Sequence, residues 1–170
     1  MKQLTTKNAT ETQKLAGILA SVLNATHLEN ICLCLNGTLG VGKTCFSQGF
    51  AEGLNVVDDV LSPTFAIVHE YSGDRDILHM DLYRLEKEDL PNLALDEMIE
   101  DHIGIVLIEW ADKHPDIIPN SNLVIEILFD DDWRLWNCWS NGQNPELSFA
   151  LEQFYNKCIE EGFEHRKNLK

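Results

Sequence analysis

Residues 36–45 read NGTLGVGKTC and directly follow the short apolar run ICLCL of residues 31–35. Within this stretch, residues 37–44 match the pattern G-x-x-x-x-G-K-[ST] at every fixed position. Glycine inside a regular element costs roughly 0.5–1 kcal/mol relative to alanine, so a cluster of glycines needs a structural reason. A buried strand before the cluster and a helix after it are the context that this pattern requires. The stretch therefore predicts a phosphate-binding loop at a strand-to-helix turn.

The residue types of this loop each have a chemical use. Its glycines let successive backbone N–H groups converge on phosphate oxygens, and the helix that starts near Gly42 adds its positive end. Lys43 can reach the β- and γ-phosphates as a point charge, and the Thr44 hydroxyl is a hard oxygen ligand suited to Mg²⁺. The alternative is a glycine-rich turn that binds nothing. The chain has no Asn-Lys-x-Asp stretch of the kind that reads guanine, which favours ATP.

The hydrophobic pattern around the loop is that of an α/β protein. Apolar residues recur at helical spacing over 10–24, where Thr10 and Gln13 fit a capping box, and a second helix is expected over 45–54. Residues 86–101 are expected to be helical in pieces, and Asn144-Pro145-Glu146 has the form of a helix start. Short apolar runs predict strands at residues 31–35, 64–71, 76–83, 104–110, 122–129 and 133–140.

Length and composition point to one domain over residues 1–170, with residues from about 142 to 170 forming a C-terminal helix and a frayed tail. No run approaches the ~20 apolar residues of a membrane span, and the N-terminus lacks the apolar core of a secretory signal. Five cysteines without a Cys-x-x-Cys pair indicate buried, reduced thiols. We therefore expect a cytoplasmic protein without membrane contact.

The charge balance is strongly acidic. Thirteen basic residues face 28 acidic ones, and the net charge is −15. Because affinity for nucleic acid comes largely from Lys and Arg contacts to phosphates, the chain should bind DNA or RNA poorly by itself. The acidity indicates either solubility alone or a basic partner protein.

Two carboxylates end apolar strands. Glu109 ends IVLIE and fits the acid of a Walker B strand better, and Asp81 ends ILHMD. Because ligands gather at the carboxyl ends of strands in parallel α/β sheets, both side chains could face the loop. One would hold Mg²⁺, directly or through water, and the other would orient or activate the attacking water. The alternative is that one of them is merely an acid at a strand end.

Other residues give weaker signals. Ser62-Pro63-Thr64 precedes a predicted strand, and its hydroxyls could sense the γ-phosphate or its metal, or the segment could be a simple turn. His79 and Asp81 alternate on one strand face, but no third residue stands at metal-ligand spacing. Trp110 is interpreted as a packing residue. Arg134 could stabilise phosphate charge, because arginines are scarce in this chain.

Four motifs in order, GTLGVGKT, SPTFAIVHEY, HMDLYRL and LIEWADK, resemble the TsaE family. This is the small bacterial ATPase of the machinery that makes N6-threonylcarbamoyladenosine in tRNA. The resemblance runs from about residue 10 to 137 and implies a P-loop NTPase-like three-layer α/β domain with a mixed, largely parallel central sheet. It also implies slow, Mg²⁺-dependent ATP hydrolysis, strengthened by the partner proteins TsaB and TsaD, with tRNA contacted only indirectly.

The resemblance also assigns roles by position. Lys43, Asp81 and Glu109 are implied as catalytic residues, and Thr44 and Glu109 as ligands of Mg²⁺. The residues implied to bind ATP or ADP are Thr12, Leu39, Gly40, Val41, Gly42, Lys43, Thr44, Cys45, Thr64 and Arg134.

The chain departs from the family pattern in three places. Thr38 stands where aspartate is usual, Cys45 stands where threonine is usual, and the residues after Gly142 extend beyond the pattern. Neither loop change removes the essential lysine or the metal-binding hydroxyl, so we expect nucleotide binding to survive.

Two other functions stay open, and one surface is a candidate interface. A small-molecule P-loop kinase usually closes an arginine-bearing lid, and no arginine cluster is present. A nucleotide-gated binding module would use ATP to order residues 62–64 for a partner. The acidic stretch near residues 86–101 is the candidate docking surface for the TsaB/TsaD complex.

Overall fold

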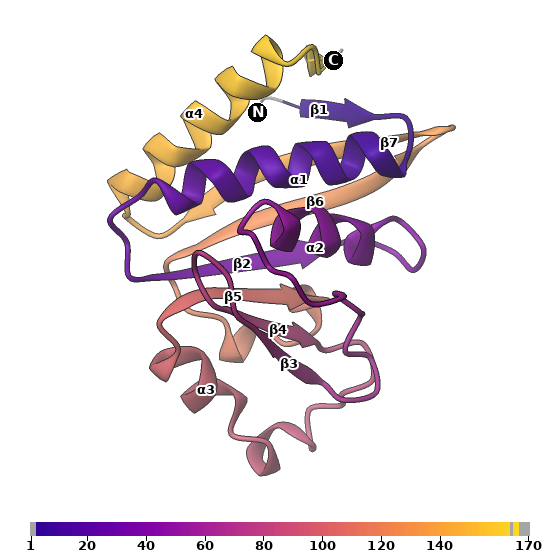
Figure 1. Cartoon of the computed structure of the whole chain (residues 1–170). Coiled ribbons are helices and arrows are strands. Elements are labelled where there is room, and N and C mark those ends of the chain that lie inside the picture. Colours follow the sequence, from indigo (N-terminus) through magenta and orange to yellow (C-terminus); the bar gives the residue numbers. More distant parts are fainter. Residues whose placement is uncertain (1–2, 164, 167–170) are drawn as a thin grey trace.

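The computed structural model describes residues 3–163 and 165–166, with side chains over 3–163. Within them, an eight-stranded sheet in the order β3-β4-β5-β2-β6-β7-β1-β8 lies between two layers of helices (Figure 1). The strands are β1 (Gln3–Thr6), β2 (Asn30–Asn36), β3 (Val68–Tyr71), β4 (Ile77–Asp81), β5 (Gly104–Glu109), β6 (Asn122–Asp130), β7 (Trp133–Asn141) and β8 (His165–Arg166). The α-helices are α1 (Ala9–Asn24), α2 (Lys43–Glu52), α3 (Leu95–Asp101) and α4 (Pro145–Glu160), and the 3₁₀ turns are η1 (Leu90–Asn92), η2 (Ala111–Lys113) and η3 (Pro115–Ile117).

The four central strands of the sheet are parallel, and the flanking strands are antiparallel. β4, β5, β2 and β6 pair in parallel, whereas β3, β7, β1 and β8 join in antiparallel pairs. In this register Leu35 of β2 and Asp81 of β4 are both paired with Glu109 of β5. The carboxyl ends of three strands therefore meet at one edge. The mixed α/β sheet is confirmed, with its parallel part confined to the centre.

Both faces of the central strands are buried, which explains why their sequences are continuous apolar runs. On one face, Leu33 and Leu107 belong to a core shared with α1, α2 and α4. On the other face, Cys32, Cys34 and Val106 belong to a second core shared with α3. Alternate residues of each strand thus enter different cores, and the predicted three-layer arrangement is confirmed.

Helices α1 and α2 lie in close contact over the first core (Figure 1). A Cβ atom on Gly49 of α2 would lie 2.4 Å from both Cα and O of Gln13 in α1. Only glycine permits that approach of two helix backbones. Because α2 begins directly after the glycine loop, this contact also fixes the position of the loop.

The start of α1 differs from the prediction. The N-cap is Asn8, whose Oδ1 accepts from the Glu11 N–H at 2.9 Å, while Glu11 Oε2 accepts from the Lys7 N–H at 2.7 Å. The expected capping box of Thr10 and Gln13 is therefore wrong by two residues. Asn8 and Glu11 satisfy the free N–H groups first, which leaves Thr10 inside the helix.

The strand expected over 64–71 is wrong in its first half, since β3 begins at Val68. Ile67 has a φ of 70°, and its N–H donates to the Pro63 carbonyl at 2.6 Å, so the chain turns before it enters the sheet. Strand β1 was not predicted, because QLTT is short and mostly polar, and it is ordered by pairing with β7.

The C-terminal helix α4 begins as predicted. The side chain of Asn144 caps it by accepting from the N–H groups of Glu146 and Leu147. Its apolar residues join the first core beside α1. The expected frayed tail lies largely outside the described residues, although residues 165–166 pair with β1. Among the described residues, every helix is too short or too polar to span a bilayer.

Candidate functional site

A cavity of about 270 Å³ opens where β4 and β5 end beside the glycine loop. It is lined by the loop, the first turn of α2, the 62–64 segment and the strand ends. The lining residues are Leu39, Gly40, Gly42, Lys43, Thr44, Cys45, Ser62, Thr64, Asp81, Tyr83, Glu109 and Trp110. Nine of the residues predicted for the site thus surround one cavity.

The glycine loop presents open backbone to this cavity. Gly40 and Gly42 have φ values of 75° and 115°, which residues with a Cβ rarely adopt. A Cβ on either would meet no atom within 4 Å. Gly42 is the N-cap of α2 and offers no side chain to the first N–H groups of the helix. Those N–H groups and the helix dipole together form an anion-binding site.

Lys43 is held inside the loop and is only 5% exposed. Its Nζ donates to the carbonyl oxygens of Gly37 at 2.7 Å and Thr38 at 3.1 Å, and it lies 3.6 Å from the ring centroid of Trp110. Burial lowers the pKa of Lys43 below its usual 10.5, and nearby carboxylates, Glu109 first among them, oppose that shift. Among the described residues that line the cavity, Lys43 is the only lysine or arginine.

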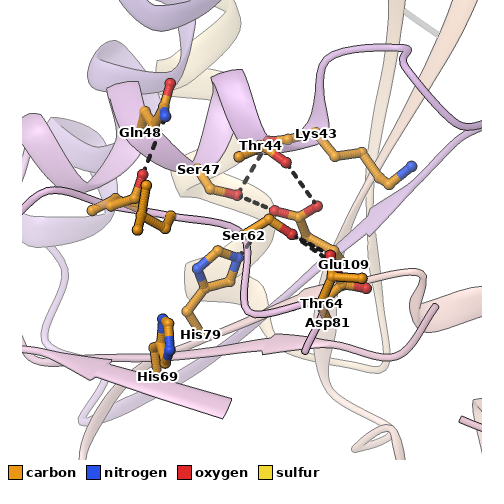
Figure 2. Close-up of polar contacts among 12 residues, drawn as sticks. Lys43, Thr44, Ser47, Gln48, Ser62, Thr64, His69, His79, Asp81 and Glu109 are labelled. Atoms are coloured by element: carbon orange, nitrogen blue, oxygen red, sulfur yellow. Dashed lines mark hydrogen bonds and ion pairs between the residues drawn. The ribbon is translucent and has the colours of Figure 1, made fainter. Parts of the chain in front are cut away.

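The Glu109 carboxylate ends β5 and is 2% exposed. Its Oε1 accepts from Ser47 Oγ at 2.9 Å and lies 3.0 Å from His79 Nε2, whereas its Oε2 lies 3.5 Å from Thr44 Oγ1. Figure 2 shows Thr44 and Ser47 on α2 above this carboxylate and His79 on the strand below it. The two oxygens thus differ: Oε1 is held on both sides, and Oε2 has only a long contact with the threonine hydroxyl.

Asp81 fixes the segment between α2 and β3 onto the site. Its Oδ2 accepts from Ser62 Oγ at 2.8 Å and Thr64 Oγ1 at 2.5 Å, and its Oδ1 accepts from the Tyr83 N–H at 2.9 Å. The two hydroxyl oxygens lie 2.7 Å from each other (Figure 2). The sequence left residues 62–64 as either a switch or a turn, and the structure places both hydroxyls at the cavity.

The donor set fits Mg²⁺ held together with a nucleotide. Thr44 and Glu109 supply a hydroxyl and a carboxylate oxygen at the cavity wall. No group of three or more His, Cys, Asp or Glu residues in the described part of the chain could hold a metal by itself. Mg²⁺ is usually bound by one or two carboxylates plus phosphate oxygens and water, so a sparse set is the expected one.

Three residues predicted to bind nucleotide do not line the cavity. Thr12 is buried in α1, and its Oγ1 lies 3.0 Å from Thr6 Oγ1. Val41 is buried beneath the loop, and its carbonyl accepts from Arg134 Nε at 3.0 Å. The guanidinium also stacks on Phe129, with 4.3 Å from Cζ to the ring centroid. Arg134 therefore braces the loop from β7, and contacts of Thr12 and Arg134 with a nucleotide stay predictions.

Sequence reasoning missed the residues that hold these groups in place. Ser47 comes three residues after Thr44, so the helical repeat puts it on the same face of α2. His79 comes two residues before Asp81, so the strand repeat puts both on one face, but the sequence alone assigns no role to His79. Trp110 was interpreted as packing, yet its ring lies under the Lys43 ammonium.

Comparison with known proteins agrees with this geometry. The family model described as threonylcarbamoyl adenosine biosynthesis protein TsaE matches residues 6–134. The tRNA threonylcarbamoyladenosine biosynthesis protein TsaE of Bacillus subtilis is 42% identical over 130 residues, which are 75% of this chain and 78% of that protein. The protein of the same name from Aquifex aeolicus is 38% identical over 133 residues, covering 75% of this chain and 89% of its own length.

A solved structure extends the likeness over most of the chain. The crystal structure of Bacillus subtilis YdiB matches with a TM-score of 0.72 and 29% identity, covering 92% of this chain and 96% of that one. The match therefore includes residues beyond the part covered by the family model. With the glycine loop, the strand-end carboxylates and the sheet order in place, the chain belongs to the TsaE family, whose members take part in the biosynthesis of threonylcarbamoyladenosine in tRNA.

Proposed function

We propose that this chain binds ATP with Mg²⁺ in the cavity beside the glycine loop and hydrolyses it slowly, in support of tRNA threonylcarbamoyladenosine synthesis. One observation carries the proposal. An uncapped helix start, a buried ammonium and two buried carboxylates converge on a single cavity. The N–H groups and the ammonium favour phosphate oxygens, and the hydroxyl and carboxylate favour a hard cation.

In this proposal the loop binds the phosphates. Backbone N–H groups between Leu39 and Thr44 donate to phosphate oxygens, and Lys43 exchanges the carbonyls of Gly37 and Thr38 for the β- and γ-phosphates. The Lys43 side chain needs to move little, because its Nζ already lies at the loop, 2.7 Å and 3.1 Å from those two carbonyl oxygens. Trp110 keeps the ammonium in this place through its ring face.

The residues around the strand ends bind the metal and position the attacking water. Thr44 and Glu109 hold Mg²⁺, which when bound neutralises charge that develops on the phosphates. Asp81 positions the 62–64 segment, because it already accepts from both hydroxyls of that segment. Ser62 and Thr64 then face the γ-phosphate end of the cavity and orient the attacking water. Loss of the phosphate changes the partners of the same hydroxyls, which gives the segment a switch role.

The partner in this proposal is a TsaB/TsaD-type complex, and tRNA is contacted only through it. All seven acidic residues within 86–101 are exposed, and Lys87 is the only basic residue of that stretch. Reversing Asp96 and Glu100 together should weaken capture of the complex in a pulldown. Reversing Glu152 and Glu160, exposed on α4, is the matched control. Equal capture by both variants removes the docking surface from the proposal.

The two alternatives differ in their support. A small-molecule kinase lid would need arginines, and none of those with described side chains lines the cavity: Arg75 donates to backbone carbonyls, Arg84 stacks on Phe65, and Arg134 binds the Val41 carbonyl. A nucleotide-gated binding module is favoured by the contacts of the 62–64 segment with Asp81. In that case hydrolysis only resets the segment.

One experiment tests the proposal. ATP and ADP binding are titrated by calorimetry with Mg²⁺, and phosphate release is measured with and without the partner complex. We expect Lys43→Ala to lose binding and Glu109→Gln to bind without hydrolysing, whereas Lys157→Ala, exposed on α4 and outside the proposed docking surface, matches wild type. A Glu109→Gln variant that still supports the pathway would favour the gated module. Folded wild-type protein that ignores millimolar ATP and ADP, even with partners, refutes the proposal.

A further inference from the structure

His79 is a fully buried histidine, and only one of its two ring nitrogens has a hydrogen-bond partner among the described residues. It lies on β4 with an exposure of 0%, and its Nε2 is 3.0 Å from Glu109 Oε1. On its other side the ring faces Tyr71, with 6.3 Å between ring centroids. Its Nδ1 is buried and has no hydrogen-bond partner among the described residues. A buried polar atom without a partner is costly, so the single contact with Glu109 needs a reason.

This geometry defines where the imidazole carries its proton. If the proton were on Nδ1, a buried N–H would lack an acceptor, and the bare Nε2 would face a carboxylate oxygen at 3.0 Å. With a proton on Nε2, the ring donates to the carboxylate oxygen whether or not Nδ1 also carries one. His79 therefore donates to Glu109.

Ser47 alone does not secure this carboxylate oxygen. Its hydroxyl has one proton and two acceptors within reach, the Lys43 carbonyl at 3.1 Å and Glu109 Oε1 at 2.9 Å. Whenever that proton serves the helix carbonyl, as serine hydroxyls inside helices do, His79 is the remaining donor to Oε1. With Oε1 held in this way, rotation of the carboxylate would break its hydrogen bonds, which keeps Oε2 on the side of the Thr44 hydroxyl.

We propose that His79 is a positioning residue that selects which oxygen of Glu109 faces the cation. The proposal rests on the proposed function, since it takes Glu109 as a ligand of Mg²⁺. Hydrogen-bond partners of metal ligands typically change metal affinity or activity 10–100-fold when they are removed. His79 does this without touching nucleotide or metal, because the whole side chain is buried behind Glu109.

Two amide variants test the role. His79→Gln places an amide donor at about the reach of Nε2, and His79→Asn places the same group one methylene too short. We expect the asparagine variant to need about 10–100-fold more Mg²⁺ for half-maximal nucleotide binding and to lose kcat with little change in KM. ADP binding in EDTA should stay at the wild-type level in both variants. The glutamine variant should stay within about threefold of wild type throughout, and thermal melts confirm that both are folded.

The outcomes separate this proposal from the one on which it rests. Equal Mg²⁺ dependence in wild type and both variants overturns it, as does an asparagine variant whose ADP binding in EDTA falls as much as its binding in Mg²⁺. Nitrogen NMR of the imidazole in nucleotide-free wild type gives an independent readout: a protonated Nε2 is expected, and a bare Nε2 overturns the proposal. A wild type that binds no nucleotide refutes the proposed function, while the NMR result still decides the hydrogen bond.

Discussion

The close contact of α1 and α2 makes Gly49→Ala a sharp test of the packing that holds the loop helix. Alanine is favoured over glycine inside a helix by about 0.8–1 kcal/mol. At this position the added Cβ would lie 2.4 Å from Cα and O of Gln13, both backbone atoms that cannot turn away. Overpacking typically costs 1–3 kcal/mol, and here we expect the upper part of that range. The net loss of unfolding free energy should be about 2 kcal/mol, or roughly 4–8 °C in Tm.

Gly17→Ala, in the facing helix, is the matched control. Its Cβ would meet only the Gly49 carbonyl oxygen, at an ordinary 3.5 Å, so the propensity gain should remain as up to about 1 kcal/mol of stabilisation. Urea unfolding followed by far-UV circular dichroism at one protein concentration measures both variants against wild type. If the two variants show the same midpoint, or Gly49→Ala is the more stable, the backbone contact does not exist as described.

Three further predictions concern thiols and the 62–64 segment. Burial raises the pKa of Cys138 from 9.0 to about 12, so the unfolded chain loses this proton at lower pH than the folded one. The free energy of unfolding should therefore fall by about 1.4 kcal/mol per pH unit between pH 9.0 and about 12. The Tm of Cys138→Ala should fall less steeply with pH over that range, and parallel curves would contradict this. Cys45 lines the cavity, so Mg²⁺-ATP should slow its alkylation severalfold in a mass-spectrometric assay, and an unchanged rate would place the nucleotide elsewhere. Asp81→Ala removes the acceptor of the Ser62 and Thr64 hydroxyls, so hydrogen exchange at the Leu61 and Ile67 amides should rise about tenfold while β5 is unaffected; equal protection would show that other contacts hold the segment.

The local parts of the site could be predicted from the sequence because the loop pattern contains its own geometry. Lys43 and Thr44 follow the glycines at fixed spacing. Helix α2 begins at Lys43, and this start needs no contact from a distant part of the chain. Glu109 and Asp81 were predicted from a general rule about strand ends, and the parallel register pairs them directly. These predictions depended on residue order within one element or on a rule that all such sheets obey.

The supporting contacts could not be predicted, because they join distant parts of the chain. His79 reaches Glu109 only through the register of two parallel strands, and a one-residue slip would point it into the other core. Residues 64–67 have strand-like composition, yet Ile67 adopts a positive φ and turns the hydroxyls of the preceding segment toward Asp81. In that case the tertiary hydrogen bonds outweighed the local preference.

The Lys43 ammonium and the carboxylates of Glu109 and Asp81 are held by other groups and not by one another. Lys43 donates to backbone carbonyls, Glu109 is held by a hydroxyl and an imidazole, and Asp81 accepts from two hydroxyls and an N–H. Within residues 3–163, no ion pair joins Lys43 to either carboxylate. Charges removed from water in this way are costly unless a counter-charge reaches them. A ligand that brings both signs, a polyphosphate for the ammonium and a divalent cation for the carboxylates, relieves both costs at once. A purely anionic or purely cationic ligand relieves only one, so binding of nucleotide and Mg²⁺ at this site should be mutually reinforcing.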